Sequence, residues 1–132
     1  MDEILIESST GSGIVRLYNS GIMYQTYKDG SELKKEDSDH EMMLYRKNFC
    51  KDTSRPILVE LDNVKTVSKE SRAIYSSPET AEVISAAALL VGNPVSRIIG
   101  NFYLGLNKSV MPVKMFTNRD EAFLWLKTFL PG

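Results

Sequence analysis

Few side chains in this chain are of types that do chemistry, and they stand apart. The single histidine, His40, and the single cysteine, Cys50, are ten positions apart. On one helix, a rise of about 1.5 Å per residue would separate them by about 15 Å, which is too far for a thiol–imidazole pair. One residue of each type also gives no zinc-ligand set. We therefore interpret His40 as a surface residue and Cys50 as a small buried thiol, and we expect no metal and no cofactor.

Two carboxylates stand closer together, at the end of an apolar run. Glu60 and Asp62 are two positions apart, so on a strand they would point to the same face. Such a pair could serve acid–base catalysis or bind a cation. The interpretation that we favour has one acid capping the following turn and the other in solvent. Residues 11–13 (GSG) lack the further pattern and the lysine of a phosphate loop, and we expect that the protein is not an enzyme.

Three apolar runs alternate with helical stretches over the second half of the chain. The runs are residues 56–61 (PILVEL), 84–91 (ISAAALLV) and 112–116 (PVKMF). The helical stretches are residues 67–82, 93–108 and 118–130. Near-continuous apolar runs of this kind indicate parallel strands buried on both faces, and therefore an α/β domain.

The N-terminal third has a different pattern. Three short β-prone segments, residues 4–8, 14–18 and 22–27, are separated by turns rich in Gly, Ser and Asn. Their alternation predicts an antiparallel meander with one face on the core. A helix is then expected from about residue 35 to 50. The predicted fold is a mixed sheet, with antiparallel N-terminal strands followed by parallel strands that alternate with helices.

Two of the predicted helices carry an apolar stripe. In the helix at 93–108 the stripe that we expect to be buried is Val95, Ile98, Ile99, Phe102 and Leu106. In the last helix it is Ala122, Trp125, Leu126 and Phe129. Gly100 and Gly105 interrupt the first of these helices, and each costs it up to about 1 kcal/mol relative to alanine. Close packing against the sheet is the interpretation that we favour for both glycines; the approach of a ligand is the alternative.

Length and composition restrict the class of protein. The 132 residues are expected to form one domain, 1–132, with an ordinary 42% hydrophobic and 25% charged content. The formal net charge of −1 gives no overall attraction to nucleic acid or to an anionic membrane. No apolar run approaches the roughly 20 residues of a membrane span, and the N-terminus lacks a signal pattern. With one cysteine, a reducing compartment fits best, and we expect a cytoplasmic location.

Candidate binding residues lie where the predicted parallel strands end, because open α/β sheets bind ligands there. After the first of these strands, Ser68 is the expected N-cap of a helix whose first turn holds Ser71 and Arg72. Helix starts present free N–H groups that suit an anion. Residues Glu60, Arg97 and Asn101 are the candidate ligand-binding residues.

The segment ILVELDNVKTVSKESRAIY, residues 57–75, resembles the strand, turn and helix of STAS domains, the fold of the anti-sigma factor antagonists. In that family, a hydrophobic strand with an acid leads through a valine to an Asp-Ser-Ser-Gly-like turn that opens a helix. Residues 85–126 resemble a group of small bacterial STAS-like proteins. The resemblance covers the chain from about Gly13 onward and implies a STAS-like fold.

Carried over by position, the resemblance assigns roles to a few residues. Glu60 matches the acid of the strand, and Ser68 stands where the family has aspartate. Lys69 and Glu70 stand at the two serines, and Ser71 stands at the glycine. The serine that is phosphorylated in the family is therefore replaced by Glu70, whose fixed negative charge could imitate one state of a switch.

The resulting expectation is a non-catalytic regulatory or protein-binding module with the partner-binding residues Ser68, Glu70, Ser71 and Arg72. The resemblance implies a protein partner, such as a sigma regulator or a sensor protein, and leaves a homodimer open. We expect no nucleic acid as partner and no membrane span. The alternative is a carrier of a small apolar ligand or lipid, because the STAS-like scaffold resembles CRAL-TRIO domains in outline. Its pocket would lie beside Gly100 and Gly105.

Overall fold

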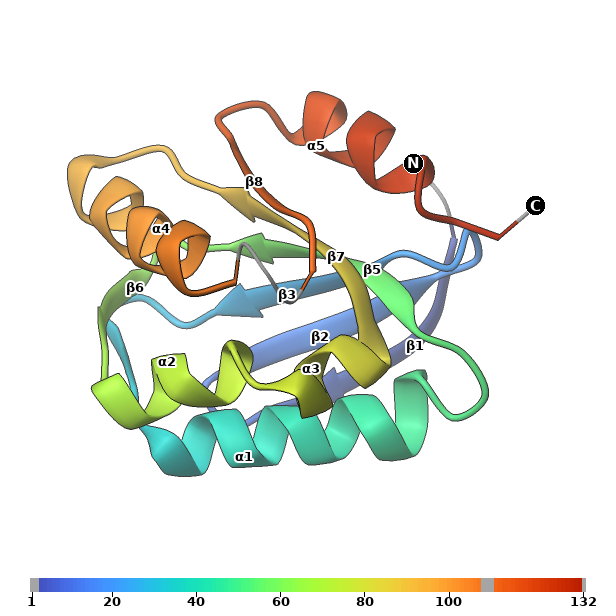
Figure 1. Cartoon of the computed structure of the whole chain (residues 1–132), viewed down its shortest axis with the longest axis horizontal. Helices are drawn as coiled ribbons and strands as arrows, with labels where there is room; N and C mark the ends of the chain where they lie inside the picture. Colours follow the sequence, from blue (N-terminus) through green and yellow to red (C-terminus); the bar gives the residue numbers. More distant parts are fainter. Residues whose placement is uncertain (1–2, 108–110, 132) are drawn as a thin grey trace.

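A mixed sheet of six strands lies at the centre of the protein, with helices on both faces (Figure 1). The protein is described by a computed structural model that covers residues 3–107 and 111–131. The order of the strands in the sheet is β1-β2-β3-β5-β7-β8. The strands are β1 (Ile4–Ser9), β2 (Gly13–Tyr18), β3 (Met23–Tyr27), β5 (Arg55–Glu60), β7 (Ile84–Leu90) and β8 (Val113–Phe116).

The direction of the strands changes once across the sheet. β1 pairs with β2, and β2 with β3, in antiparallel register, whereas β3, β5, β7 and β8 are parallel. The predicted fold class is therefore confirmed. A second sheet of two short parallel strands, β4 (Ser31–Leu33) and β6 (Val64–Val67), was not predicted. Strands of three and four residues are too short for their apolar periodicity to be read from sequence.

The helices lie close to the predicted stretches. They are α1 (Lys35–Leu44) with a π-helical last turn η1 (Tyr45–Phe49), α2 (Lys69–Tyr75), α3 (Pro78–Val83), α4 (Pro94–Asn107) and α5 (Arg119–Lys127). The stretch predicted at 67–82 is divided between α2 and α3, because Pro78 begins a new helix. Lys108, the predicted end of α4, lies outside the described residues. Among residues 3–107 and 111–131, each helix is too short or too polar to cross a membrane.

The helices cover the sheet unequally. α1, α2 and α3 lie along one face and α5 lies along the other (Figure 1). In β7, the buried Ala88 packs with Leu126 of α5, whereas the neighbouring Leu89 packs with Ile99 of α4 on the opposite face. This central strand is therefore buried on both faces, as predicted. α4 lies beside α2 on the α1 side, where the Tyr75 and Tyr103 rings meet edge to face with centroids 5.8 Å apart.

The predicted buried stripe of α4 is wrong at three positions. Val95, Ile98 and Phe102 are 48%, 58% and 49% exposed, and of the predicted stripe Ile99 is the residue that the structure buries. The helix is rotated because Gly100 faces the sheet: a Cβ added there would meet the sulfur of Met115 at 2.8 Å. Packing against the sheet is thus the reason for this glycine. The same prediction is wrong for Gly105, where an added Cβ would meet no described atom within 4 Å. The side chain of Leu106, the fifth member of the stripe, lies outside the described part of the structure.

Candidate functional site

The first turn of α2 divides the four predicted partner-binding residues between surface and interior. The Ser68 hydroxyl caps the helix by accepting a hydrogen bond from the Ser71 N–H at 3.1 Å. Ser71 is itself buried, and its hydroxyl contacts the hydroxyl of Ser38 on α1. Glu70 is exposed. Arg72 is half-buried, and its guanidinium lies 4.5 Å from the centroid of the Phe102 ring on α4.

The three candidate ligand-binding residues do not come together. Glu60 lies on the α5 side, where its carboxylate accepts a hydrogen bond from the Tyr24 hydroxyl and lies 3.6 Å from the Arg119 guanidinium. Arg97 and Asn101 are exposed on α4, which packs on the other face of the sheet.

The second carboxylate of the predicted pair, Asp62, holds the start of α4 against the loop after β5. Asp62 Oδ1 accepts hydrogen bonds from the Gly92 N–H at 2.6 Å and from the Ser96 hydroxyl at 3.0 Å. Asn93 Oδ1 accepts from the Ser96 N–H at 2.8 Å. The favoured interpretation is therefore wrong: Asp62 binds the segment that leads into α4 and not the turn that follows it in the chain, and Glu60 is held by side chains of β3 and α5. An acid–base pair finds no support in this geometry.

His40 and Cys50 have separate surroundings. The His40 ring nitrogen Nδ1 lies 3.0 Å from the carbonyl oxygen of Thr10. The Cys50 thiol lies 3.6 Å from the sulfur of Met23 in the core, and burial raises its pKa to about 11. A thiol with such a pKa stays protonated and unreactive at neutral pH. Within residues 3–107 and 111–131, His, Cys, Asp and Glu side chains form no cluster of three that could hold a metal ion.

A shallow groove separates α2 from α4. It is lined by Lys69, Arg72, Ala73, Ser76, Asn101, Phe102 and Gly105. The exposed Val95, Ile98 and Phe102 continue from the groove along α4. Glu70 lies instead in a second groove, between α1, α2 and α3. We call the groove between α2 and α4, together with those three side chains and the exposed Arg97, the α2–α4 surface. It joins Arg72, a predicted partner-binding residue, with Asn101, a predicted ligand-binding residue.

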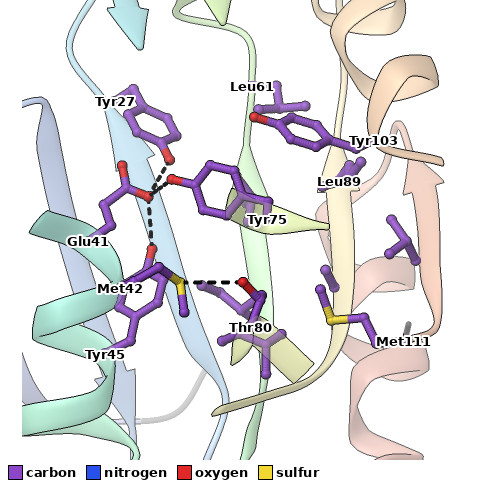
Figure 2. Close-up of a pocket in the computed structure, with 15 residues that line it drawn as sticks. Tyr27, Glu41, Met42, Tyr45, Leu61, Tyr75, Thr80, Leu89, Tyr103 and Met111 are labelled. Atoms are coloured by element: carbon purple, nitrogen blue, oxygen red, sulfur yellow. Dashed lines mark hydrogen bonds between the residues drawn. The ribbon is translucent and has the colours of Figure 1, made fainter. Parts of the chain in front are cut away.

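A buried carboxyl group on α1 was not predicted as a functional residue. Glu41 is fully buried, and three tyrosine hydroxyls from three elements converge on its Oε1 atom (Figure 2). Tyr27 of β3 donates at 3.0 Å, Tyr45 of η1 lies at 3.4 Å, and Tyr75 of α2 donates through a shorter contact. The other carboxyl oxygen, Oε2, is buried and has no hydrogen-bond partner among the described residues.

A cavity of about 50 Å³ lies beside this carboxyl group. Its polar lining comes from Glu41, the three tyrosines that surround it, Tyr103 and Thr80. The rest of the lining is apolar: Met42, Ile57, Val59, Leu61, Ile84, Ala87, Leu89, Met111 and Val113. None of the described lining residues is Lys, Arg or His. We call this space the Glu41 cavity.

Burial controls the ionisation of this cluster. Removal from solvent raises the pKa of Glu41 to about 7, although the hydrogen bonds from Tyr75, Tyr27 and Tyr45 act in the opposite direction. Burial also raises the pKa of each of these three tyrosines well above 10, so they remain donors. Near neutral pH, Glu41 is therefore divided between its ionised and its neutral form.

The sequence does carry a signal for Glu41. Met42, Tyr45 and Phe49 indicate the buried side of the first helix, and Glu41 precedes Tyr45 by one helical turn. It therefore lies on the buried face. Four tyrosines distributed over β3, η1, α2 and α4 could not be assigned to the same cluster without the topology.

The comparisons with known proteins bear on the fold. Crystal structures that match include an uncharacterised protein of the DUF3478 family with a SpoIIAA-like fold, from Shewanella loihica PV-4. It is 11% identical and covers 96% of this chain and 95% of its own, with a TM-score of 0.56. A protein of unknown function from Arthrobacter sp. FB24 is 28% identical and covers 91% of this chain and 96% of its own, with a TM-score of 0.34.

The likeness to the Shewanella protein shows the fold alone, and it confirms the STAS-like fold that the sequence predicted. No curated protein matches the chain significantly. The model of one protein family, "Domain of unknown function (DUF7793)", matches residues 16–130. Since this match spans most of the chain, the protein belongs to the DUF7793 family.

Proposed function

We propose that the protein is a non-catalytic protein-binding module of the STAS type, and that it binds its partner through the α2–α4 surface. The observation that carries this proposal is the exposed stripe on α4. Val95, Ile98 and Phe102 follow a spacing of three and four residues and are each about half exposed. Apolar side chains that gather on one exposed face mark an interaction site more often than single ones do.

The charges around this stripe indicate the chemistry of the partner. Lys69 and Arg72 line the groove, and Arg97 is exposed on α4. A partner that fits would present an apolar patch bordered by acidic side chains, because complementary charge favours encounter and register. Phe102 under the Arg72 guanidinium is a rigid aromatic anchor of the type that dominates binding energy at interfaces.

Glu70, which lines the neighbouring groove between α1, α2 and α3, would give the module its regulatory character. It is exposed in the first turn of α2, at the position that resembles the phosphorylated serine of STAS domains. A permanent negative charge there would fix the protein in one state of the family's switch, without the need for a kinase. The resemblance favours a sigma regulator or a sensor protein as the partner, and a second copy of this chain is the competing occupant.

A charge reversal tests this proposal. The immobilised protein is used to isolate a partner, which is then titrated against the wild type, Glu70→Lys and Glu36→Lys. Glu36 is the matched control, because it is an exposed acid in the first turn of α1. We expect Glu70→Lys to change the dissociation constant at least tenfold and Glu36→Lys to change it less than twofold, with melting temperatures that barely differ.

Equal affinities for all three proteins would exclude Glu70 from the interface. Sedimentation of the wild type alone examines the competing occupant. A dimer that Glu70→Lys dissociates would replace the foreign partner with a second copy.

A further inference from the structure

We propose that β1 is the surface at which a second copy of this chain binds, by antiparallel pairing of the two β1 strands across a two-fold axis. This pairing joins the two six-stranded sheets at their edges. It does not depend on the function proposed for the α2–α4 surface. β1 and β8 are the two ends of the sheet, and α4 packs beside β8 (Figure 1).

The backbone of β1 supplies the first reason. β2 occupies one side of β1, and among the described elements it is the one with which β1 has extensive contacts. The Thr10 N–H, just after β1, donates to the Gly13 carbonyl of β2 at 2.9 Å. Because successive residues of a strand alternate in direction, the N–H and C=O groups of Glu7 and Ser9 point away from β2. A row of such groups is a template for another strand.

The two edges of the sheet differ in their protection against such pairing. β8, the opposite edge, has four residues, contains Lys114 and follows Pro112. Short length, lysine and proline are devices that keep an edge strand from pairing. β1 has six residues and contains neither lysine nor proline. Its register shift lies between Ile4 and Ile6, and the ladder from Ile6 to Ser9 is regular. β8 is therefore protected, whereas β1 is available.

The side chains of β1 supply the second reason. Ile4, Leu5 and Ile6 are 48%, 61% and 36% exposed. Among the described residues, they are the one place where three consecutive large apolar side chains are exposed. Apolar side chains that gather in this way mark an interaction site more often than single ones do. On a free edge, they favour the addition of a strand.

The charge of β1 suits a second copy of the chain. Its one charged residue is Glu7, whose carboxylate lies 2.5 Å from the Arg16 guanidinium on β2. The edge is therefore neutral, so two identical edges meet without repulsion, and a strongly charged foreign strand finds no complementary charge. A two-fold axis at Ile6 places this side chain opposite the same side chain of the second copy, and Glu7 opposite Leu5.

The length of β1 limits the strength of the dimer. Six residues at about 3.4 Å each give a strand of about 20 Å. One pair of such strands gives an interface near the low end of the roughly 1,200–2,000 Å² that specific complexes bury. We therefore expect a dissociation constant in the micromolar range, and a monomer at nanomolar concentrations.

Sedimentation equilibrium of the full chain, at concentrations up to about 300 µM, tests the pairing. We expect a monomer–dimer equilibrium for the wild type. Ile6→Lys places two ammonium groups opposite each other at the axis, so it should weaken the dimer at least tenfold. Leu124→Lys is the matched control, because Leu124 is a 64% exposed aliphatic residue on α5. It should change the dissociation constant less than twofold, and melting temperatures verify that both variants fold.

Two further measurements locate the contact without adding a charge. Ile6→Cys should form a disulfide-linked dimer under mild oxidation, because opposite residues of paired strands bring their Cβ atoms within about 5.5 Å. Leu124→Cys should remain unlinked. In the wild type, amide hydrogen exchange at Glu7 and Ser9 should slow as the protein concentration passes the dissociation constant. This last measurement keeps the test decisive if Ile6→Lys does not fold.

Three outcomes would overturn the proposal. A wild type that stays monomeric up to the highest concentration would leave the β1 edge to a foreign strand or to solvent. A dimer that Ile6→Lys leaves intact and Phe102→Ala dissociates would place the contact on the α2–α4 surface. Exchange at Glu7 and Ser9 that does not depend on concentration would show that the edge of β1 stays free in the dimer.

Discussion

Glu41 should make the stability of this protein depend on pH in an unusual direction. Burial raises its pKa from 4.5 to about 7. Between these two values the folded protein retains a proton that the unfolded chain has released. The unfolded state then binds fewer protons, so the free energy of unfolding must fall as the pH rises. The contribution of Glu41 is complete below about pH 4.5 and is lost above about pH 7.

The size of this effect follows from the two pKa values. At 1.36 kcal/mol for each pKa unit, the difference corresponds to about 3 kcal/mol, which is a large part of the stability of an ordinary domain. Glu41→Gln does not titrate and keeps the shape of the side chain. The difference in free energy of unfolding, wild type minus Glu41→Gln, should therefore decrease by about 3 kcal/mol from pH 4.5 to pH 8.

Urea denaturation at a series of pH values measures this difference. Comparison with Glu41→Gln cancels the contributions of the other carboxylates, and Glu36→Gln controls for the loss of an exposed acid on the same helix. Curves for wild type and Glu41→Gln that run parallel across this range would refute the assignment of Glu41 as a carboxyl group with a raised pKa. A difference that grows with pH would refute the sign of the argument.

Two further predictions concern the core and the thiol. Leu89→Asp places a charge without a partner in β7, which is buried on both faces. The substitution should lower the free energy of unfolding by several kcal/mol and yield an insoluble product. A soluble variant that unfolds cooperatively would contradict the central position of β7. The pKa of about 11 at Cys50 leaves roughly a hundredfold less thiolate at pH 8 than a free cysteine has. Its reaction with an aromatic disulfide reagent should therefore be at least that much slower in the folded protein than in denaturant, and equal rates would show an accessible thiol.

Much of the fold was accessible from sequence because burial determines where apolar residues stand along the chain. The run at residues 84–91 is apolar at seven of its eight positions, and only a strand covered on both faces requires that. The orientation of α4 was not accessible in the same way. Apolar residues occupy both sides of this helix. Which side faces the sheet depends on Gly100, whose missing side chain leaves room for Met115, and on Asp62, whose carboxylate binds the Ser96 hydroxyl. Both partners belong to other elements.

In the candidate sites, too, contacts between residues close in sequence could be predicted, whereas contacts between distant residues could not. The cap at Ser68 was predicted correctly because capping is a local property. The burial of Ser71 depends instead on Ser38, which is 33 residues away in the chain. The Glu41 cluster likewise requires tyrosines from four elements. Sequence patterns locate such residues on faces of helices and strands, but the faces meet only in the folded protein.

The measurement that tests the proposed function most directly is the affinity of a captured partner for Phe102→Ala and Leu124→Ala. Phe102 is 49% exposed on the α2–α4 surface, whereas Leu124 is 64% exposed on α5, on the other face of the sheet. Both variants remove a large exposed apolar side chain. Binding through the α2–α4 surface predicts at least a tenfold loss of affinity for Phe102→Ala and less than a twofold change for Leu124→Ala. Equal affinities of the two variants, or a loss confined to Leu124→Ala, would contradict it.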